Sequence, residues 1–181
     1  MIYYKSFELK NGEKCSLRSG GPGDAEAVLA NFIKTHGESD FLTTYPDECT
    51  FTLEQEANYI ERKLLSERET EIIADIGGKI VGTAGVDAIG RAEKVRHRAS
   101  FGISVEKAYW GLGIGRAMTL ACIECARKAG YLQLELEVVA ANERAVELYK
   151  SLGFIEYGRN PLGFNSRENG MQELIGMRLE L

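Results

Sequence analysis

Short apolar segments bounded by turn residues run along the chain, and several of them alternate between apolar and polar positions. This pattern predicts β-strands that bury one face. Asn11-Gly12 and Gly77-Gly78 are dipeptides typical of two-residue turns, so each is expected to join its flanking strands as a hairpin. The predicted strands are residues 2–9, 14–19, 70–76, 79–89, 99–105, 131–140, 154–158 and 172–180.

The segment 131–140 shows the most regular alternation. Its polar positions Gln133, Glu135 and Glu137 are predicted to share one face of the sheet, because side chains two residues apart on a strand point the same way. The opposite face is expected to point into the core and carries Leu132, Leu134, Leu136 and Val138. The two glutamates are therefore expected on the face of this strand that lies away from the apolar core.

Four segments instead show the period near 3.6 that predicts amphipathic helices. They are residues 25–36, 53–65, 113–129 and the segment that follows Asn142. Asp24, Thr52 and Asn142 are predicted N-caps, and Gln55 completes a capping box with Thr52. The first helix is expected to bury Ala27, Val28, Phe32 and Ile33, and the last helix to bury Ala145, Leu148, Tyr149 and Leu152.

The elements follow the order ββααβββαβαββ. Residues 99–140 form a strand–helix–strand unit, which is expected to be a right-handed crossover between parallel strands. The hairpins on either side of it are antiparallel. We therefore predict one α/β (α+β) domain over residues 1–181, with a mixed, mostly antiparallel twisted sheet and helices on both faces.

The net charge, the first ten residues and the length of the apolar runs limit the classes of function that the sequence allows. The net charge of −5 argues against nucleic acid or an anionic membrane as the main partner. Residues 1–10 lack the layout of a signal peptide, and no apolar run approaches the 18 residues of a membrane span. These features favour a cytoplasmic protein.

The four cysteines fit a reducing compartment, since a chain of 181 residues does not depend on disulfides. Cys122 and Cys125 have the C-x-x-C spacing of redox and metal sites. They also share a helical stripe with apolar neighbours, namely Ile114, Ala117, Met118 and Ala121. We favour a buried helix face over a redox site and expect no metal.

Three alternating glycines, Gly111, Gly113 and Gly115, directly precede a predicted helix. A dinucleotide fingerprint fails because Arg116 stands where its third glycine is required. A nucleotide P-loop fails because Gly115 is not followed by Lys and Ser or Thr. A nicotinamide-dependent oxidoreductase is accordingly disfavoured.

The first turn of a helix nevertheless offers free N–H groups and a positive dipole end, which suit a pyrophosphate. Arg116 would complement such an anion. The alternative is a tight strand-to-helix turn in which the glycines serve packing alone. The residues by themselves do not separate these two interpretations.

Two motifs together resemble the signatures of the GNAT N-acetyltransferase superfamily. Residues 105–118 read VEKAYWGLGIGRAM and are similar to the acyl-CoA signature Q/R-x-x-G-x-G/A, with Trp110 in place of Gln or Arg. Residues 142–154 read NERAVELYKSLGF and resemble the second signature, N-x-x-A-x-x-L-Y-x-x-x-G-F. The resemblance covers about residues 70–181 well and the first 70 residues only in the order of their elements.

The resemblance implies that the central parallel strands splay apart and hold acetyl-CoA. The pyrophosphate would lie on the backbone amides of residues 111–116, which are Gly111, Leu112, Gly113, Ile114, Gly115 and Arg116. The backbone of Val105 would pair with the pantetheine arm, and Asn142 would lie near it. Arg116 and Lys150 would contact phosphates of CoA, although both side chains are equally typical of solvated helix charges.

The implied activity is direct transfer of an acetyl group from acetyl-CoA to a primary amine. Tyr149 is the predicted partner of the leaving thiolate, and it is better described as a hydrogen-bond donor than as a full acid, since its ordinary pKa of about 10 exceeds that of a thiol, about 8.5. Glu137 is the predicted general base, because some family members that act on protein N-termini carry a glutamate here in an L-E-V segment. Glu135, His97 or a chain of water molecules are the alternatives.

The acceptor stays open between a peptide N-terminus, which the L-E-V segment favours, and a small-molecule amine. An edge strand near the C-terminus is compatible with a homodimer. An alternative of a different class is a non-catalytic acyl-CoA-binding sensor or regulatory module. That module would bind acetyl-CoA and show no turnover with any amine.

Overall fold

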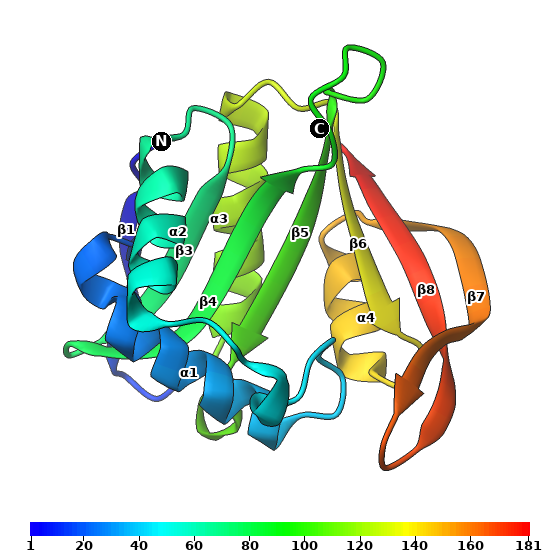
Figure 1. Ribbon diagram of the computed structural model, residues 1–181, viewed down its shortest axis with the longest axis horizontal. Helices are drawn as coiled ribbons and strands as arrows, with labels where there is room; N and C mark the ends of the chain where they lie inside the picture. The colour runs from blue at the N-terminus through cyan, green and yellow to red at the C-terminus, as the bar shows by residue number, and fades with distance from the viewer.

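The computed structural model describes residues 1–181 and contains one eight-stranded sheet with four α-helices (Figure 1). The strands are β1 (Tyr4–Glu8), β2 (Lys14–Ser19), β3 (Thr70–Ile76), β4 (Lys79–Ala88), β5 (Arg98–Val105), β6 (Gln133–Val139), β7 (Ile155–Ser166) and β8 (Gly170–Glu180). The helices are α1 (Ala25–Glu38), α2 (Leu53–Leu65), α3 (Ile114–Lys128) and α4 (Glu143–Ser151). Three single-turn 3₁₀ helices cover Pro22–Asp24, Pro46–Glu48 and Lys107–Tyr109.

The strands lie in the order β1-β2-β3-β4-β5-β6-β8-β7, and every neighbouring pair is antiparallel except β5 and β6. The predicted parallel crossover and the mixed, mostly antiparallel sheet are thereby confirmed. Helices α1 and α2 pack on one face of the sheet, here called the front, around a small apolar cluster. Helices α3 and α4 share the larger core of 27 buried residues on the back face.

The alternation of the predicted strand 131–140 is largely confirmed. Leu134, Leu136 and Val138 are buried in the larger core. Leu132 is 63% exposed, and its predicted burial is wrong because β6 begins only at Gln133. The residue therefore lies in the turn after α3 and outside the regular pleat.

Helix α1 turns a different face to the sheet from the one predicted. Ala27 and Ile33 are exposed, whereas Val28, Asn31 and Thr35 are buried. The polar members of this face form hydrogen bonds, since the Thr35 hydroxyl donates to the Asn31 carbonyl at 2.9 Å. Apolar periodicity misplaced the buried stripe because this stripe is partly polar.

The capping predictions have mixed outcomes. The capping box of α2 is confirmed, with Gln55 N–H donating to Thr52 Oγ1 at 3.2 Å and Thr52 N–H donating to Gln55 Oε1 at 2.9 Å. Asp24 makes no side-chain cap to α1. Its carboxylate instead accepts two hydrogen bonds from Arg18, at 2.7 and 2.8 Å, and one from Gly21 N–H at 2.8 Å.

Strand β7 is longer than predicted, running from Ile155 to Ser166. It carries Gly158, Pro161 and Gly163, residues that argue against a strand interior. The strand tolerates them because it is the edge of the sheet and pairs only with β8, with irregular register on the way.

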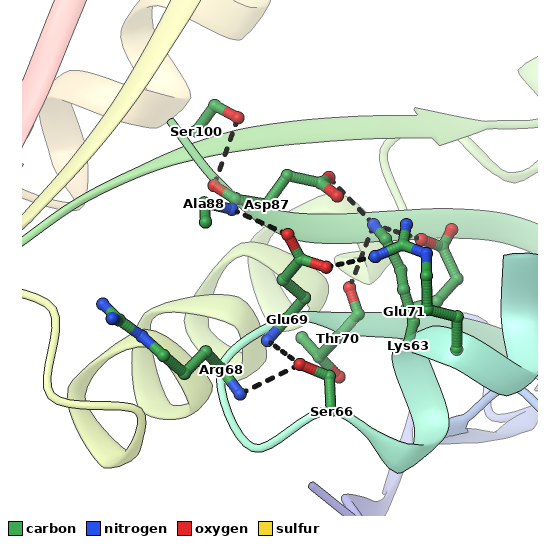
Figure 2. A network of polar contacts seen from close by, with 10 residues as sticks. Lys63, Ser66, Arg68, Glu69, Thr70, Glu71, Asp87, Ala88 and Ser100 are labelled. Carbon is green, nitrogen blue, oxygen red and sulfur yellow. Dashed lines mark hydrogen bonds and ion pairs between the residues drawn. The ribbon is translucent and has the colours of Figure 1, made fainter. Parts of the chain in front are cut away.

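Lys63 anchors helix α2 to the front of the sheet through a buried ion cluster (Figure 2). Its ammonium group donates to Asp87 Oδ2 on β4 at 2.8 Å and to Glu71 Oε2 on β3 at 3.2 Å. Burial lowers the pKa of Lys63, but the neighbouring carboxylates outweigh that effect and raise it above its ordinary value. The lysine therefore stays charged, and the carboxylates of Glu71 and Asp87 on the two strands below it balance its charge.

The close approach of this cluster to the sheet requires a glycine at position 85. A Cβ atom on Gly85 would lie 2.8 Å from Lys63 Nζ and 2.9 Å from Glu71 Oε2. The missing side chain thus leaves the space in which the ion pair forms.

Glu106 anchors helix α1 in a similar way, directly after β5 ends. Its carboxylate accepts from Lys34 of α1 at 2.8 Å, from Lys79 of β4 at 2.7 Å and from the Asn31 amide at 3.4 Å. Burial alone would raise the pKa of Glu106, but the bonds from Lys34 and Lys79 lower it below its ordinary value.

Replacing Lys63 by Met tests the α2 anchor. The substitution leaves Glu71 buried without its cation, so we expect the free energy of unfolding to fall by about 3 kcal/mol or more. The matched control is Arg62→Ala on the same helix, whose ion pair with Glu69 is exposed and contributes less than about 1 kcal/mol. Urea unfolding followed by circular dichroism measures both changes, and equal losses would contradict the anchoring role.

Replacing Glu106 by Gln tests the α1 anchor and its pH dependence. Loss of the charged acceptor should cost about 1.5–3 kcal/mol at pH 7. Because the folded-state pKa of Glu106 is lowered, its contribution is complete above the unfolded-state pKa of about 4.3 and is lost as the pH falls through the folded-state pKa.

The difference in unfolding free energy between wild type and Glu106→Gln should therefore stay constant from about pH 7 to 5 and shrink below about pH 4. The exposed Glu61→Gln on α2 serves as the control and should change stability by less than about 0.5 kcal/mol. A Glu106 effect that grows on acidification would refute the assignment.

Candidate active site

Strands β5 and β6 pair over only three residues each, Arg98–Ser100 with Gln133–Glu135. Beyond this short ladder β5 continues to Val105 and β6 to Val139 without pairing to each other. Figure 1 shows the two strands separating toward their C-terminal ends. Backbone groups that a regular sheet would pair thus remain available along both sides of the gap.

A cavity of about 1000 Å³ occupies this gap and is lined from both faces of the sheet. On the back face it reaches the glycine loop and α4, and on the front face it reaches the segment that joins α1 to α2. Residues from both sequence motifs and the glutamates of β6 therefore surround one continuous space.

The end of β5 presents a backbone N–H group to the gap. Glu106 N–H donates to Val81 of β4 at 2.9 Å, and alternation along an antiparallel strand then directs the N–H of Val105 away from β4. The carbonyl of Val105 already accepts a hydrogen bond from the indole of Trp110 at 2.7 Å. Trp110 thereby ties the glycine loop back to the strand.

The glycine loop reaches α3 through two residues with positive φ, Gly111 at 82° and Gly113 at 101°. A Cβ at either position would meet no atom within 4 Å, so backbone conformation rather than packing calls for glycine there. The first bond of α3 runs from Ala117 N–H to the Gly113 carbonyl. The amides of residues 114–116 are thus the free N–H groups of the helix start, with no side-chain cap.

The other predicted cofactor residues differ in their positions. Gly115 and Arg116 line the cavity, and Arg116 also donates to Ser151 at 2.9 Å. Leu112 and Ile114 do not line it, and the Ile114 side chain is buried in the core. Lys150 also lies outside the lining and pairs with Glu147 at 3.4 Å, and its phosphate contact stays a prediction.

Helix α4 brings Asn142 and Tyr149 to the cavity. Asn142 caps the helix, as predicted, by accepting from Ala145 N–H at 3.3 Å. Tyr149 is 8% exposed and packs against Phe101 and Phe154, with ring centroids 6.1 and 5.8 Å away. Burial raises the pKa of Tyr149 to about 12, so its hydroxyl remains a hydrogen-bond donor at neutral pH.

The three candidate bases occupy different environments. Glu135 accepts a two-pronged ion pair from Arg98, with one N–O distance of 2.7 Å, and this contact lowers the pKa of Glu135. His97 lies outside the cavity, beside a separate hollow of about 670 Å³. Glu137 lines the cavity, is exposed and forms no ion pair. Of the three, Glu137 alone combines access to the cavity with a free carboxylate.

Several cavity residues were missed in the sequence. Phe41 and Leu42 line the cavity from the segment between α1 and α2, where an adjacent apolar pair in a loop was the one available hint. Tyr157 lines it from β7. Its placement depends on a register shift between Glu156 and Gly158 that local sequence does not reveal.

Cys122 and Cys125 are both buried and free, as the apolar stripe predicted. Burial raises the pKa of Cys125 to about 11, which makes a reactive thiolate unfavourable. No group of three or more His, Cys, Asp or Glu side chains is arranged to hold a metal ion. No helix combines the length and the apolar character needed to cross a membrane.

Known proteins with similar sequences are acetyltransferases. The chain is 35% identical to N-alpha-acetyltransferase RimI of Mycobacterium tuberculosis over 97 aligned residues. The aligned segment covers 54% of this chain and 59% of that protein. It is 30% identical over 161 residues to mycothiol acetyltransferase of Thermobispora bispora, covering 83% of this chain and 49% of that protein. The chain thus spans about half to three-fifths of the length of such relatives.

Solved structures share the fold over nearly the whole chain. An acetyltransferase of the GNAT family from Streptococcus pneumoniae superposes with a TM-score of 0.88 at 27% identity, covering 92% of this chain and 99% of that one. The yncA acetyltransferase from Salmonella typhimurium, solved with its cofactor acetyl-CoA, gives a TM-score of 0.80 at 19% identity over 92% of this chain and 94% of that one. The second likeness concerns the fold alone.

The family match itself extends over residues 32–154, from α1 to the end of the second motif. It includes the glycine loop, both strands of the gap and the whole of α4. Since it covers more than half of the chain, the protein belongs to the acetyltransferase (GNAT) family.

Proposed function

We propose that the protein transfers an acetyl group from acetyl-CoA to a primary amine by direct attack within a ternary complex. The observation that carries the proposal is the cavity through the gap between β5 and β6. On one side it meets free helix amides, and on the other a free carboxylate, Glu137. A donor and an acceptor could therefore meet from opposite faces of the sheet.

The glycine loop supports binding of the donor, and acetyl-CoA is the cosubstrate of the family. The amides of residues 114–116 and the positive end of α3 favour a pyrophosphate. Arg116 adds a positive charge at the same edge of the cavity. The free N–H of Val105 is suited to a carbonyl acceptor of an extended arm lying in the gap, such as pantetheine.

The chemistry requires a neutral amine, a stabilised oxyanion and a stabilised leaving thiolate. We assign the thiolate to Tyr149, whose raised pKa favours donation of a hydrogen bond over loss of its proton. We assign removal of the ammonium proton to Glu137, directly or through water. A protein α-amine, with a pKa of about 7.7–8.0, would ease that step relative to a lysine-like amine of about 10.4.

The acceptor is a primary amine, on a peptide N-terminus or a small molecule. The relatives named above include an N-alpha-acetyltransferase and a mycothiol acetyltransferase. The four free cysteines support a cytoplasmic setting. The exposed edge strand β7 is compatible with a homodimer.

Thermal unfolding with and without acetyl-CoA tests the donor site. Ligand at about a hundred times its Kd should add roughly 2.7 kcal/mol, a rise in Tm of about 5–11 °C for a chain of this size. NADH and ATP should give smaller shifts. No shift with millimolar acetyl-CoA in a folded sample would overturn the donor assignment.

Gly113→Ala should weaken acetyl-CoA binding, because a side chain at this φ strains the loop that carries the amides. Gly78→Ala is the matched control, since Gly78 also has a positive φ and open space but lies in the β3–β4 turn, away from the cavity. Both variants should lose similar stability, and Gly113→Ala alone should lose affinity by calorimetry.

Tyr149→Phe should lower kcat about 100-fold while leaving the Kd of acetyl-CoA nearly unchanged, because the hydroxyl acts as the thiolate forms. Release of CoA thiol measures turnover. Tyr131→Phe is the control, since Tyr131 is a buried tyrosine outside the cavity. Unchanged kcat in Tyr149→Phe would remove the assigned role, and absence of turnover with every amine would favour an acyl-CoA-binding module.

A further inference from the structure

We infer that the front of the cavity selects a primary amine that carries one positive charge and an apolar substituent. This inference rests on the proposed function and specifies its acceptor.

The floor of the front cavity is built from small residues. Ser100, Gly102 and Ser104 line it from β5. They share the front face because residues two apart on a strand point the same way. Their small side chains leave room above the strand for a substituent attached to the reacting amine.

The floor offers one free negative charge. Glu135 is neutralised by the two-pronged contact from Arg98, and Gln133 also donates to it at 2.8 Å. Glu137 has no such partner and is exposed to the cavity. A single carboxylate complements one ammonium group, whereas a polyamine would leave its further charges without partners in this space.

Tyr157 covers the floor from the side of β7. A Cβ on Gly176 would lie 2.8 Å from the Tyr157 ring atom Cζ and 3.1 Å from its hydroxyl oxygen, so the hydroxyl end of the ring lies over this glycine of β8. Gly176 is the register partner of Glu137 on β6. The hydroxyl of Tyr157 is therefore directed toward the strand that carries Glu137.

The electrostatics of Tyr157 agree with this placement. Burial and the charges of Glu135 and Glu137 raise the pKa of Tyr157. Its hydroxyl remains protonated and neutral at physiological pH. It can therefore orient an amine beside Glu137 without adding a second charge.

The opposite wall presents two apolar side chains among the polar Thr35, Ser39 and Thr43, and a polar clasp holds it in position. Phe41 and Leu42 line the cavity and are half-buried. The adjacent Asp40 accepts hydrogen bonds from Ser166 at 2.5 Å and from Asn169 at 2.6 Å, both at the turn between β7 and β8. The clasp thus joins the α1–α2 segment to the far hairpin and keeps its apolar side chains over the cavity.

A second contact strengthens the clasp. Arg167 N–H donates to the Tyr45 hydroxyl at 2.6 Å, and the Arg167 guanidinium pairs with Asp47 at 2.9 Å. Ile89 lines the same cavity from the connection after β4. The substituent next to the amine therefore meets apolar surface, and burying it is favourable by about 25 cal/mol per Å².

Acceptor preference tests the inference. With acetyl-CoA present, kcat/KM for 2-phenylethylamine and isopentylamine should exceed that for spermidine and ethanolamine by about tenfold or more. Tetrapeptides that begin with Leu or with Asp form the second arm of the experiment, in which kcat/KM is compared between the apolar and the acidic first residue. A preference among the peptides alone would identify an N-terminus as the source of the same chemistry, and a preference among the free amines would identify a small molecule.

Substitutions in the cavity wall test which side chains determine the preference for apolar amines. Phe41→Ala combined with Leu42→Ala should reduce the ratio of 2-phenylethylamine to ethanolamine about tenfold, because the apolar wall is lost. Leu65→Ala, an exposed apolar residue of α2 outside the cavity, should leave the ratio unchanged. Tyr157→Phe should raise KM for the amine severalfold with an unchanged Kd for acetyl-CoA, and Gly176→Ala should act similarly by displacing the ring.

Direct binding of the amines separates this inference from the proposed function. Isothermal titration of 2-phenylethylamine and spermidine, without acetyl-CoA, should favour the former in wild type and lose affinity in Glu137→Gln. Preference for spermidine, or an unaltered ratio in the Phe41 and Leu42 double variant, would overturn the inference even if transfer occurs. Selective binding of the amine by a protein that does not bind acetyl-CoA would uphold this inference and would contradict the proposed transferase activity.

Discussion

The site depends on the brevity of one parallel strand pair. β5 and β6 share a ladder of three residues and then part, although both strands continue. Unpaired backbone groups are costly when they are buried without partners, so such a gap is stable only when solvent or a ligand satisfies them. The cavity between the two strands is therefore a direct consequence of how the sheet is paired, and the helices on each face supply its two different ends.

Charge rather than apolar packing fastens the front helices. The apolar cluster beneath α1 and α2 contains five buried residues, against 27 in the core behind the sheet. Lys63 and Glu106 compensate for the small apolar cluster by forming buried ion clusters. Each cluster has specific partners and links one helix to particular strands. Such contacts favour one placement of the front helices on the sheet, because each charge is stable only beside its partner.

Local patterns predicted the parts of this structure that local physics determines. The alternation in β6, the burial of Tyr149 on α4 and the capping box at Thr52 follow from neighbouring residues. Helix α4 buries Val146 in place of the predicted Ala145, Leu148 and Leu152, which are only partly buried. The two motifs led to the cavity and its free helix amides. The polar face of α1 depends on residues far along the chain, since Asn31 donates to Ile80 and to Glu106. The partner of Asp24 is only six residues away, but no local pattern indicates that Arg18 takes the place of a helix cap. Tyr157 could not be placed because its position rests on a register shift and on a glycine in another strand.

The hydrogen bond from the Trp110 indole to the Val105 carbonyl makes the donor and the acceptor of Val105 unequally available in the gap. One lone pair of that oxygen is already engaged, so the N–H of Val105 is the freer of its two backbone groups. A chain lying in the gap is therefore best matched at this point when it offers a carbonyl oxygen. Trp110 would thus act on such a chain through the backbone of Val105.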